Sequence, residues 1–211
     1  MSDSNLKKSF DRNRPLSWSA ISSFRYNHEQ WYQKYVLKKE QPKSKAMEFG
    51  SKVGDSFATS DKLAPVVTYK VMEYKVEANL LNKDTKEVIK MVGFIDSYDP
   101  EKKLLREYKT SANDKKWTQK TVDDHLVGGG QLTMYCLMLY LSEGVKPEEI
   151  TIHLDYIPVQ ETGFFELEVL KDKVKSFQTK RTLRQVLEFG AYIHKTLREM
   201  EEYCQSRVDT E

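Results

Sequence analysis

The sequence predicts a mixed α/β or α+β fold of a single domain. Three observations carry this prediction: helical apolar spacing at both ends of the chain, three alternating segments in succession between residues 66 and 110, and a strongly apolar helix after them. The chain has 211 residues, the length of one domain, and 39% of them are hydrophobic, enough to fill a core. The expected order is therefore helices, a meander of three strands, and then helix, strands and helix.

The amino-terminal part begins with a polar segment and continues as an amphipathic helix. Residues 1–15 are polar and are expected to form a flexible lead-in, so the predicted domain covers residues 16–211. Ser17 and Ser19 are both suitable N-caps, and apolar residues then recur three and four positions apart as far as Val36. This spacing predicts a helix over the whole stretch.

A second helix is predicted from Lys45 to about Thr59, after Pro42 has interrupted the first. It contains Gly50 and Gly54, and each glycine costs a helix about 1 kcal/mol relative to alanine. A close approach of another segment would explain such a cost.

The remaining elements follow from alternation, turns and helical spacing. Alternating apolar residues predict three strands, at 66–79, 88–98 and 103–110. Residues 111–127 are polar with short helical character, and three glycines at 128–130 then open an apolar helix over 131–142. The rest is predicted as strands 150–159 and 164–170, followed by one or two amphipathic helices within 171–207.

Composition excludes several protein classes. The longest apolar run, from Met134 to Leu141, is far shorter than the ~20 residues that span a bilayer, so an integral membrane protein is not expected. The first residues lack the apolar stretch of a signal peptide, and a cytoplasmic location is expected. Cys136 and Cys204 are too few for a disulfide framework or a four-cysteine metal site.

Charge is distributed unevenly along the chain. Residues 1–52 contain eight lysines and three arginines against two aspartates and three glutamates, whereas the formal charge of the whole chain is +2. A basic amino-terminal part beside a mildly acidic remainder fits a phosphate backbone on one side and an acidic site elsewhere. A solvated helix face with a frayed tail would carry the same charges.

Two adjacent predicted strands place acidic and basic side chains where a phosphodiester could be hydrolysed. Asp96 ends one hydrophobic strand just before a turn, and Glu107 and Lys109 lie two apart in the next strand, so both project from the same face. If the strands pair as a hairpin around Asp99 and Pro100, Asp96 and Glu107 come close enough to share one hard cation. A neighbouring lysine can then orient the attacking water and offset charge at the phosphorus.

These strands resemble the RecB-like branch of the PD-(D/E)XK nuclease superfamily, which includes exonuclease-like proteins of phages and bacteria. The pattern G-x-I-D, a turn, and a strand ending in (D/E)-x-K-T is matched by residues 93–96 and 107–110. The resemblance implies a restriction-endonuclease-like core, with a mixed central β-sheet flanked by helices. It also implies Mg²⁺ or Mn²⁺ bound by Asp96, Glu107 and the main-chain carbonyl of Tyr108, with Lys109 positioning the hydroxide.

A second motif follows these strands. Gln131 and Tyr135 match the Q-x-x-x-Y motif of the same branch, and they lie four apart, on one face of a helix. The resemblance implies that Gln131 orders the metal-bound water or the catalytic lysine and that Tyr135 approaches the DNA backbone. An ordinary core helix whose first turn carries a glutamine is the alternative.

The predicted helix over 45–59 departs from the family pattern. RecB-like enzymes usually place a metal-binding histidine four residues after the helix glycine, whereas this chain has Gly54 there. Asp55 is expected about 100° around the helix from this position and Glu48 nearly two turns before it, so either could replace the histidine only if the helix is shifted or irregular. Glu73, on the strand before G-x-I-D, could take a water-mediated metal contact or simply face solvent. The expected consequence is a lower metal affinity or an empty second-metal position.

The segment after the second of these strands has the composition of a nucleic-acid contact. Lys115, Lys116 and Trp117 combine charge with an aromatic ring, which can hold phosphate and stack a base. A solvated loop with one anchored tryptophan would have the same composition.

The sequence therefore predicts a Mg²⁺- or Mn²⁺-dependent deoxyribonuclease, of exonuclease type, that acts in DNA recombination, repair or phage DNA processing in a bacterium or phage-infected cell. Its expected partners are single- or double-stranded DNA, with a recombination or replication protein as a further candidate and no membrane. One alternative is a catalytically degenerate nuclease fold that binds nucleic acid or protein. Another is an unrelated α+β interaction domain, in which Lys109 faces solvent and Asp96 lies far from Glu107.

Overall fold

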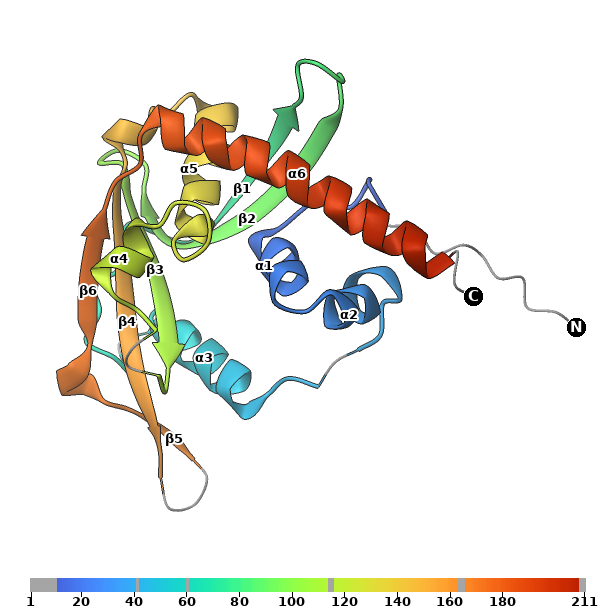
Figure 1. Cartoon of the computed structure of the whole chain (residues 1–211). Coiled ribbons are helices and arrows are strands. Elements are labelled where there is room, and N and C mark those ends of the chain that lie inside the picture. Colours follow the sequence, from blue (N-terminus) through green and yellow to red (C-terminus); the bar gives the residue numbers. More distant parts are fainter. Residues whose placement is uncertain (1–10, 41, 60, 114–115, 163–165, 209–211) are drawn as a thin grey trace, which may run out of the picture.

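The computed structural model of the chain describes residues 11–40, 42–59, 61–113, 116–162 and 166–208, so most of the expected lead-in lies outside the described residues. Helices cover a six-stranded sheet (Figure 1). The strands are β1 (Val71–Leu81), β2 (Val88–Asp99), β3 (Leu104–Ser111), β4 (Thr151–Glu161), β5 (Leu167–Val169) and β6 (Lys175–Thr179). The helices are α1 (Trp18–Tyr26), α2 (His28–Trp31), the π-helical turn η1 (Tyr32–Val36), α3 (Lys45–Ser56), α4 (Gln119–Asp123), α5 (Gly130–Glu143) and α6 (Leu183–Val208), with 3₁₀ turns η2 (Pro147–Glu149) and η3 (Lys171–Lys173).

The sheet is mixed. The strands β1, β2 and β3 form the predicted meander, because each pairs antiparallel with the next. β3 then lies parallel to β4, from Leu104 opposite Thr151 to Ser111 opposite Pro158. A parallel neighbour cannot be reached through a tight turn, so α4 and α5 make the crossover between the two strands. β5 and β6 both pair antiparallel with β4. The prediction of a mixed sheet flanked by helices is confirmed.

The prediction of one continuous helix as far as Val36 is wrong, because this stretch forms α1, α2 and η1 in succession. Ser17 caps α1 as expected, since its side chain accepts a hydrogen bond from the N–H of Ala20. The helix then ends at Asn27, whose backbone is extended and whose side chain accepts a hydrogen bond from the N–H of Gln30. Asparagine competes with helical hydrogen bonding through its side chain, and here it ends α1 and caps α2.

The predicted helical stretch 171–207 is wrong in its first part. Residues 171–179 form η3 and the strand β6 instead, and α6 begins at Leu183. In β6, Phe177 lies opposite Leu154 of β4, and it packs against the main core. Pairing with the open edge of β4 satisfies the backbone of this segment, and such a long-range partner cannot be read from local spacing.

α5 is the central buried element. Every residue from Leu132 to Leu139 is buried, and the helix packs against β1, β2 and α6. A helix that is apolar on all sides is expected between two layers of structure. A second, smaller core cluster joins Val53 of α3 and Phe57, the residue after that helix, to Ile157 of β4. None of the helices in the described ranges is long and apolar enough to traverse a membrane.

Gly129 and Gly130 allow the loop before α5 to pack closely on its surroundings. A Cβ atom at Gly129 would lie 2.3 Å from the carbonyl oxygen of Val122, and one at Gly130 would lie 2.3 Å from Cη2 of Trp18. The buried Arg181 donates hydrogen bonds to the carbonyls of Val122 and Gly129 and to Thr133 Oγ1. Its guanidinium therefore ties this loop to the first turns of α5.

We predict that Gly129→Ala lowers the free energy of unfolding by about 1–3 kcal/mol, the usual cost of overpacking a tight site. The added methyl group would meet the main chain of Val122, which cannot move aside as the end of a side chain could. Gly54→Ala is the matched control, because a Cβ there meets nothing within 4 Å and alanine favours a helix by about 1 kcal/mol. Urea denaturation followed by circular dichroism measures both variants, and a Gly129→Ala protein as stable as the wild type would contradict the packing.

Candidate active site

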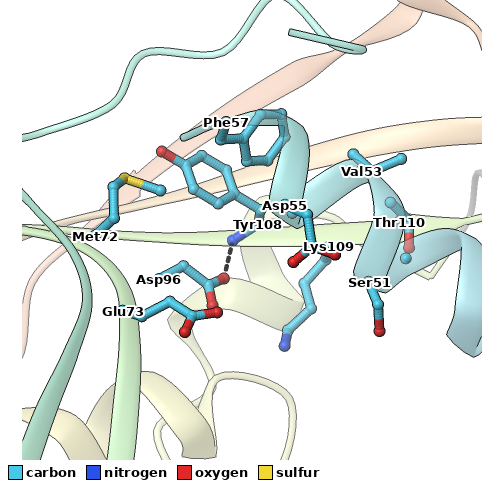
Figure 2. Close-up of a pocket in the computed structure, with 12 residues that line it drawn as sticks. Ser51, Val53, Asp55, Phe57, Met72, Glu73, Asp96, Tyr108, Lys109 and Thr110 are labelled. Atoms are coloured by element: carbon cyan, nitrogen blue, oxygen red, sulfur yellow. Dashed lines mark hydrogen bonds between the residues drawn. The ribbon is translucent and has the colours of Figure 1, made fainter. Parts of the chain in front are cut away.

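Asp96 and Glu107 lie opposite one another on β2 and β3. The antiparallel register pairs Ser97 with Arg106, and one step further along the two strands Asp96 faces Glu107. Asp96 Oδ2 accepts a hydrogen bond of 2.8 Å from the main-chain N–H of Tyr108, the residue next to Glu107 (Figure 2). The hairpin therefore brings the two carboxylates together as its geometry predicted.

Glu107 and Lys109 share one face of β3. Lys109 Nζ lies 2.5 Å from Glu107 Oε1. The Glu107 side chain is 2% exposed, whereas the Lys109 side chain keeps 30% of its surface accessible. The ammonium group of Lys109 thus pairs with the buried Glu107 and also lines the accessible cavity. An interaction domain with Lys109 pointing away and Asp96 far from Glu107 is not what this chain forms.

Burial controls the protonation of these groups. Loss of hydration, together with the neighbouring Asp96, raises the pKa of Glu107 to about 8. Loss of hydration also raises the pKa of Asp96, although the charge of Lys109 opposes the rise. Burial alone would lower the pKa of Lys109, but the charges of Glu107 and Asp96 outweigh it and raise that pKa. The site contains more acidic groups than one lysine neutralises, which favours uptake of a proton or a cation.

The oxygen atoms of the site fit a hard divalent cation. Glu107 Oε2 is buried without a hydrogen-bond partner among the described residues, which is costly for a carboxylate. The carbonyl of Tyr108 points to the same side of β3 as the N–H that binds Asp96, because both groups of an extended residue face one neighbour. Mg²⁺ binds through one or two carboxylates and keeps several waters. No three His, Cys, Asp or Glu side chains form a metal-holding group in the described ranges, so water would have to complete the shell.

Glu73 lies opposite Asp96 on the other neighbouring strand, because Met72 pairs with Ser97 and Tyr74 with Ile95. Its φ angle is +49°, a left-handed conformation that residues with side chains rarely adopt and that is often found at functional sites. The two carboxyl groups lie side by side at the same cavity (Figure 2). The charge of Glu73 contributes to the raised pKa of Asp96. Glu73 lines the cavity and is also exposed to solvent, and its water-mediated metal contact stays a prediction.

Side-chain alternation breaks at the level of Glu73. On β2, Ile95 and Tyr98 both belong to the main core although they are three residues apart. A regular strand would place them on opposite faces. On β1, Tyr74 packs against the main core while Met72 packs against the cluster beneath α3. The break turns the carboxylates between these residues out of the core and into the cavity.

A cavity of about 380 Å³ lies between these strands and α3, and Asp55 and Gly54 line it. The two helix glycines differ in their surroundings. A Cβ at Gly50 would lie 3.0 Å from Thr110 Oγ1, which is the close approach that the sequence suggested, whereas Gly54 faces open space. Glu48 is exposed and lines a separate hollow, so it does not replace the missing histidine. Asp55 is the acidic residue of α3 that reaches the cavity.

Gln131 and Tyr135 form a hydrogen-bonded chain that ends on β2. Gln131 Nε2 donates to the Tyr135 hydroxyl at 2.7 Å, and that hydroxyl donates to the carbonyl of Phe94 at 2.5 Å. Tyr135 is only 4% exposed. Tyr135 and Gln131 also line a larger cavity that Lys109 shares, so the expected approach of Tyr135 to a DNA backbone stays a prediction. The hydrogen-bonded pair fixes β2 two residues before Asp96.

Lys116 and Trp117 line a second cavity beside Lys109, whereas Lys115 lies outside the described residues. Sequence reasoning missed Phe94, which lines the same cavity and is 54% exposed. A signal was available, because Phe94 precedes the fully buried Ile95 and neighbouring strand residues face opposite sides. An exposed phenylalanine two residues before Asp96 marks the accessible surface of the site.

Comparison with known proteins is consistent with these observations. The family model of the PD-(D/E)XK nuclease superfamily matches residues 53–210 of this chain. The solved structure of a proposed exonuclease from Eubacterium rectale is similar over 98% of this chain and 87% of its own, with a TM-score of 0.56 and 13% identity. A phage-related exonuclease from Haemophilus somnus 129PT is similar over 92% of this chain and 84% of its own, with a TM-score of 0.47 and 12% identity. Curated proteins gave no sequence match. At 13% identity, the similarity to the Eubacterium rectale protein shows a shared fold.

The raised pKa of Glu107 predicts that stability depends on pH. Between its ordinary pKa of 4.5 and about 8, the folded state retains a proton that the unfolded state has released, so the free energy of unfolding falls as pH rises through this window. Asp96 acts in the same direction, and Glu107→Gln should therefore reduce the fall without abolishing it. Thermal unfolding of both proteins across this window, in the presence of a chelator, measures the difference. Equal slopes for wild type and variant would show that Glu107 does not titrate in this way.

Proposed function

The chain belongs to the PD-(D/E)XK nuclease superfamily, and from this membership we propose that it is a Mg²⁺- or Mn²⁺-dependent deoxyribonuclease. The observation that carries the proposal is the meeting of Asp96, Glu107 and Lys109 on two neighbouring strands. The description of the Eubacterium rectale neighbour supports exonuclease action. Recombination, repair or phage DNA processing is the corresponding cellular role.

Asp96 and Glu107 would hold the divalent ion, with the main-chain carbonyl of Tyr108 as a third ligand. Enzymes of this superfamily generally use divalent metal ions. When bound, such an ion lowers the pKa of a coordinated water and stabilises negative charge on phosphate oxygens. The unpartnered Oε2 of Glu107 and the accessible carboxylate of Glu73 support this assignment, with Glu73 and Asp55 contacting the ion through water.

Lys109 would act on the attacking water and on the phosphate. Its raised pKa keeps the ammonium charged at neutral pH. Lys109 is the one cationic side chain among the described residues that line the catalytic cavity. A charged donor at this place can orient a water and stabilise the charge that develops on the phosphate oxygens. Its partial exposure leaves donor hydrogens free to reach both.

Gln131 and Tyr135 would act as positioning residues. Their hydrogen-bonded chain fixes the carbonyl of Phe94, and so sets the path of β2 just before Asp96. A ligand held within about half an ångström of its productive place depends on such supporting contacts. The basic amino-terminal part would add sequence-independent attraction to the DNA backbone.

We predict that the purified protein degrades labelled linear DNA in Mg²⁺ or Mn²⁺ and not in a chelator. Asp96→Ala should abolish the activity, because it removes a metal ligand. Lys109→Ala should lower it by about 10²- to 10³-fold, the usual loss when one charged transition-state donor is removed. Denaturing gel electrophoresis of end-labelled strands measures the rates.

Matched controls for these variants lie on the exposed turn between β1 and β2. Asp84→Asn and Lys83→Ala remove the same charges in the turn beyond Leu81 and Val88, the last pair of the β1–β2 hairpin, and both should retain wild-type activity. Activity that persists in Asp96→Ala and Lys109→Ala would remove the assignment. DNA binding without cleavage in either metal would instead identify a catalytically degenerate member of the superfamily.

We further predict that Gly54→His strengthens metal binding several-fold. The position lines the catalytic cavity, a Cβ atom there meets no atom within 4 Å, and a neutral imidazole would add a nitrogen ligand to the carboxylates. Gly54→Ala is the control, because it adds a side chain without a ligand. Isothermal titration with Mn²⁺ compares the three proteins. Equal affinities would show that this position does not face the ion.

A further inference from the structure

A second cavity, of about 820 Å³, lies beside the catalytic cavity and shares Lys109 with it. Its walls come from α1, β2, the segment after β3, the loop before α5 and the first turns of α5, where Gln131 and Tyr135 line it. The residues that matter for its chemistry are Trp18, Phe94, Lys116, Trp117 and Val127. We call this cavity the lateral groove. It meets the catalytic cavity at the one side chain that both contain.

The two cavities differ in charge. The catalytic cavity is lined by Asp55, Glu73 and Asp96 against the single cation Lys109. Among the described residues that line the lateral groove there are two lysines, Lys109 and Lys116, and no acidic side chain. A metal cation is therefore favoured in the first cavity and a phosphate group in the second.

The lateral groove also exposes aromatic surface. Phe94 is 54% exposed and Val127 is 66% exposed, although burial of such side chains is usually favourable. Trp117 is partly buried against the core, which holds its ring in place, and Lys116 Nζ lies 5.9 Å from the centroid of that ring. Anchored rings beside lysines form the kind of surface on which unpaired bases stack.

On the premise of the proposed nuclease function, we propose that the lateral groove binds single-stranded DNA and delivers it to the catalytic cavity. Bases stack on Phe94 and Trp117, and Lys116 contacts the phosphates between them. The strand then reaches Lys109, where the two cavities meet. Single-stranded DNA is accordingly the preferred substrate of this chain.

The rings distinguish single-stranded from double-stranded DNA. In a duplex both faces of each base are covered by its neighbours, so an aromatic side chain can stack only after the helix has opened. In a single strand the faces are available, and each stacked base contributes about 1–3 kcal/mol of binding free energy. The absence of acidic lining among the described residues favours a polyanion over a peptide of mixed charge.

The test is a binding measurement without divalent metal, so that it is independent of cleavage. The probes are a labelled oligothymidylate, an abasic strand of the same length, and a blunt duplex of that length, each measured by fluorescence anisotropy. The wild type should bind the oligothymidylate at least tenfold more tightly than the other two. Phe94→Ala should weaken oligothymidylate binding by about 5- to 100-fold, the range expected for one lost stacked base, and leave abasic binding unchanged.

Two further variants make the result specific to the rings. Tyr26→Ala removes an aromatic side chain that is 89% exposed and lies outside the lateral groove, and it should bind all probes as the wild type does. Trp117→Phe keeps a ring and the core packing, so it should retain most of the affinity that Trp117→Ala loses. A loss in Trp117→Ala that Trp117→Phe does not recover would indicate a folding defect rather than lost stacking, and would overturn the role of Trp117.

Failure of this inference can be told apart from failure of the proposed function. Metal-dependent DNA cleavage combined with tighter binding of the duplex, or with unchanged binding by Phe94→Ala, would overturn the single-strand groove and leave the nuclease intact. Ring-dependent binding of the oligothymidylate without cleavage in Mg²⁺ or Mn²⁺ would retain the groove as a binding site and refute the nuclease.

Discussion

The rest of the site depends on a glutamate held almost entirely out of water. Glu107 is 2% exposed, and one of its oxygen atoms has no partner among the described residues. Burying a carboxylate costs several kcal/mol unless opposite charge and hydrogen bonds compensate it. Lys109 provides part of that compensation through Oε1, while Asp96 beside it increases the cost. The fold thus contains a locally unfavourable centre that a proton or a cation relieves, and the raised pKa of Glu107 reports this.

Maintaining such a centre requires a rigid frame on both sides. On the cavity side, the N–H of Tyr108 fixes Asp96, and the left-handed Glu73 turns the neighbouring strand so that its carboxylate also faces outward. On the core side, Tyr135 binds the main chain of β2, and Arg181 ties the loop before α5 to that helix. The site therefore depends on long-range contacts of α5 and Arg181 as well as on the hairpin itself.

The sequence was sufficient where local rules decide the outcome. The two-residue spacing of Glu107 and Lys109 and the turn after Asp96 determined the shared face and the approach of the two carboxylates. The sequence was insufficient where the conformation of a segment depends on a partner far away along the chain. β6 forms because β4 offers an open edge, and Glu73 is strained because alternation breaks in two strands at once. The position of the Tyr135 hydroxyl also depends on a distant partner, the carbonyl of Phe94, which lies 41 residues away along the chain.

Electrostatics explains why the two cavities have to be separate and adjacent. A surface lined by several carboxylates repels the phosphates of DNA, so the residues that favour a metal ion oppose the approach of the substrate. For the proposed DNA substrate, a separate groove whose described lining has no acidic side chain would reduce the conflict, because it would attract the strand first. Lys109 belongs to both cavities and is paired with Glu107, so its charge faces the acid on one side and the incoming strand on the other. Because Gly54 has no side chain to add a ligand, the proposed metal binding depends more strongly on the carboxylates of the catalytic cavity. Separating these carboxylates from the phosphates of the proposed DNA strand is then correspondingly more important.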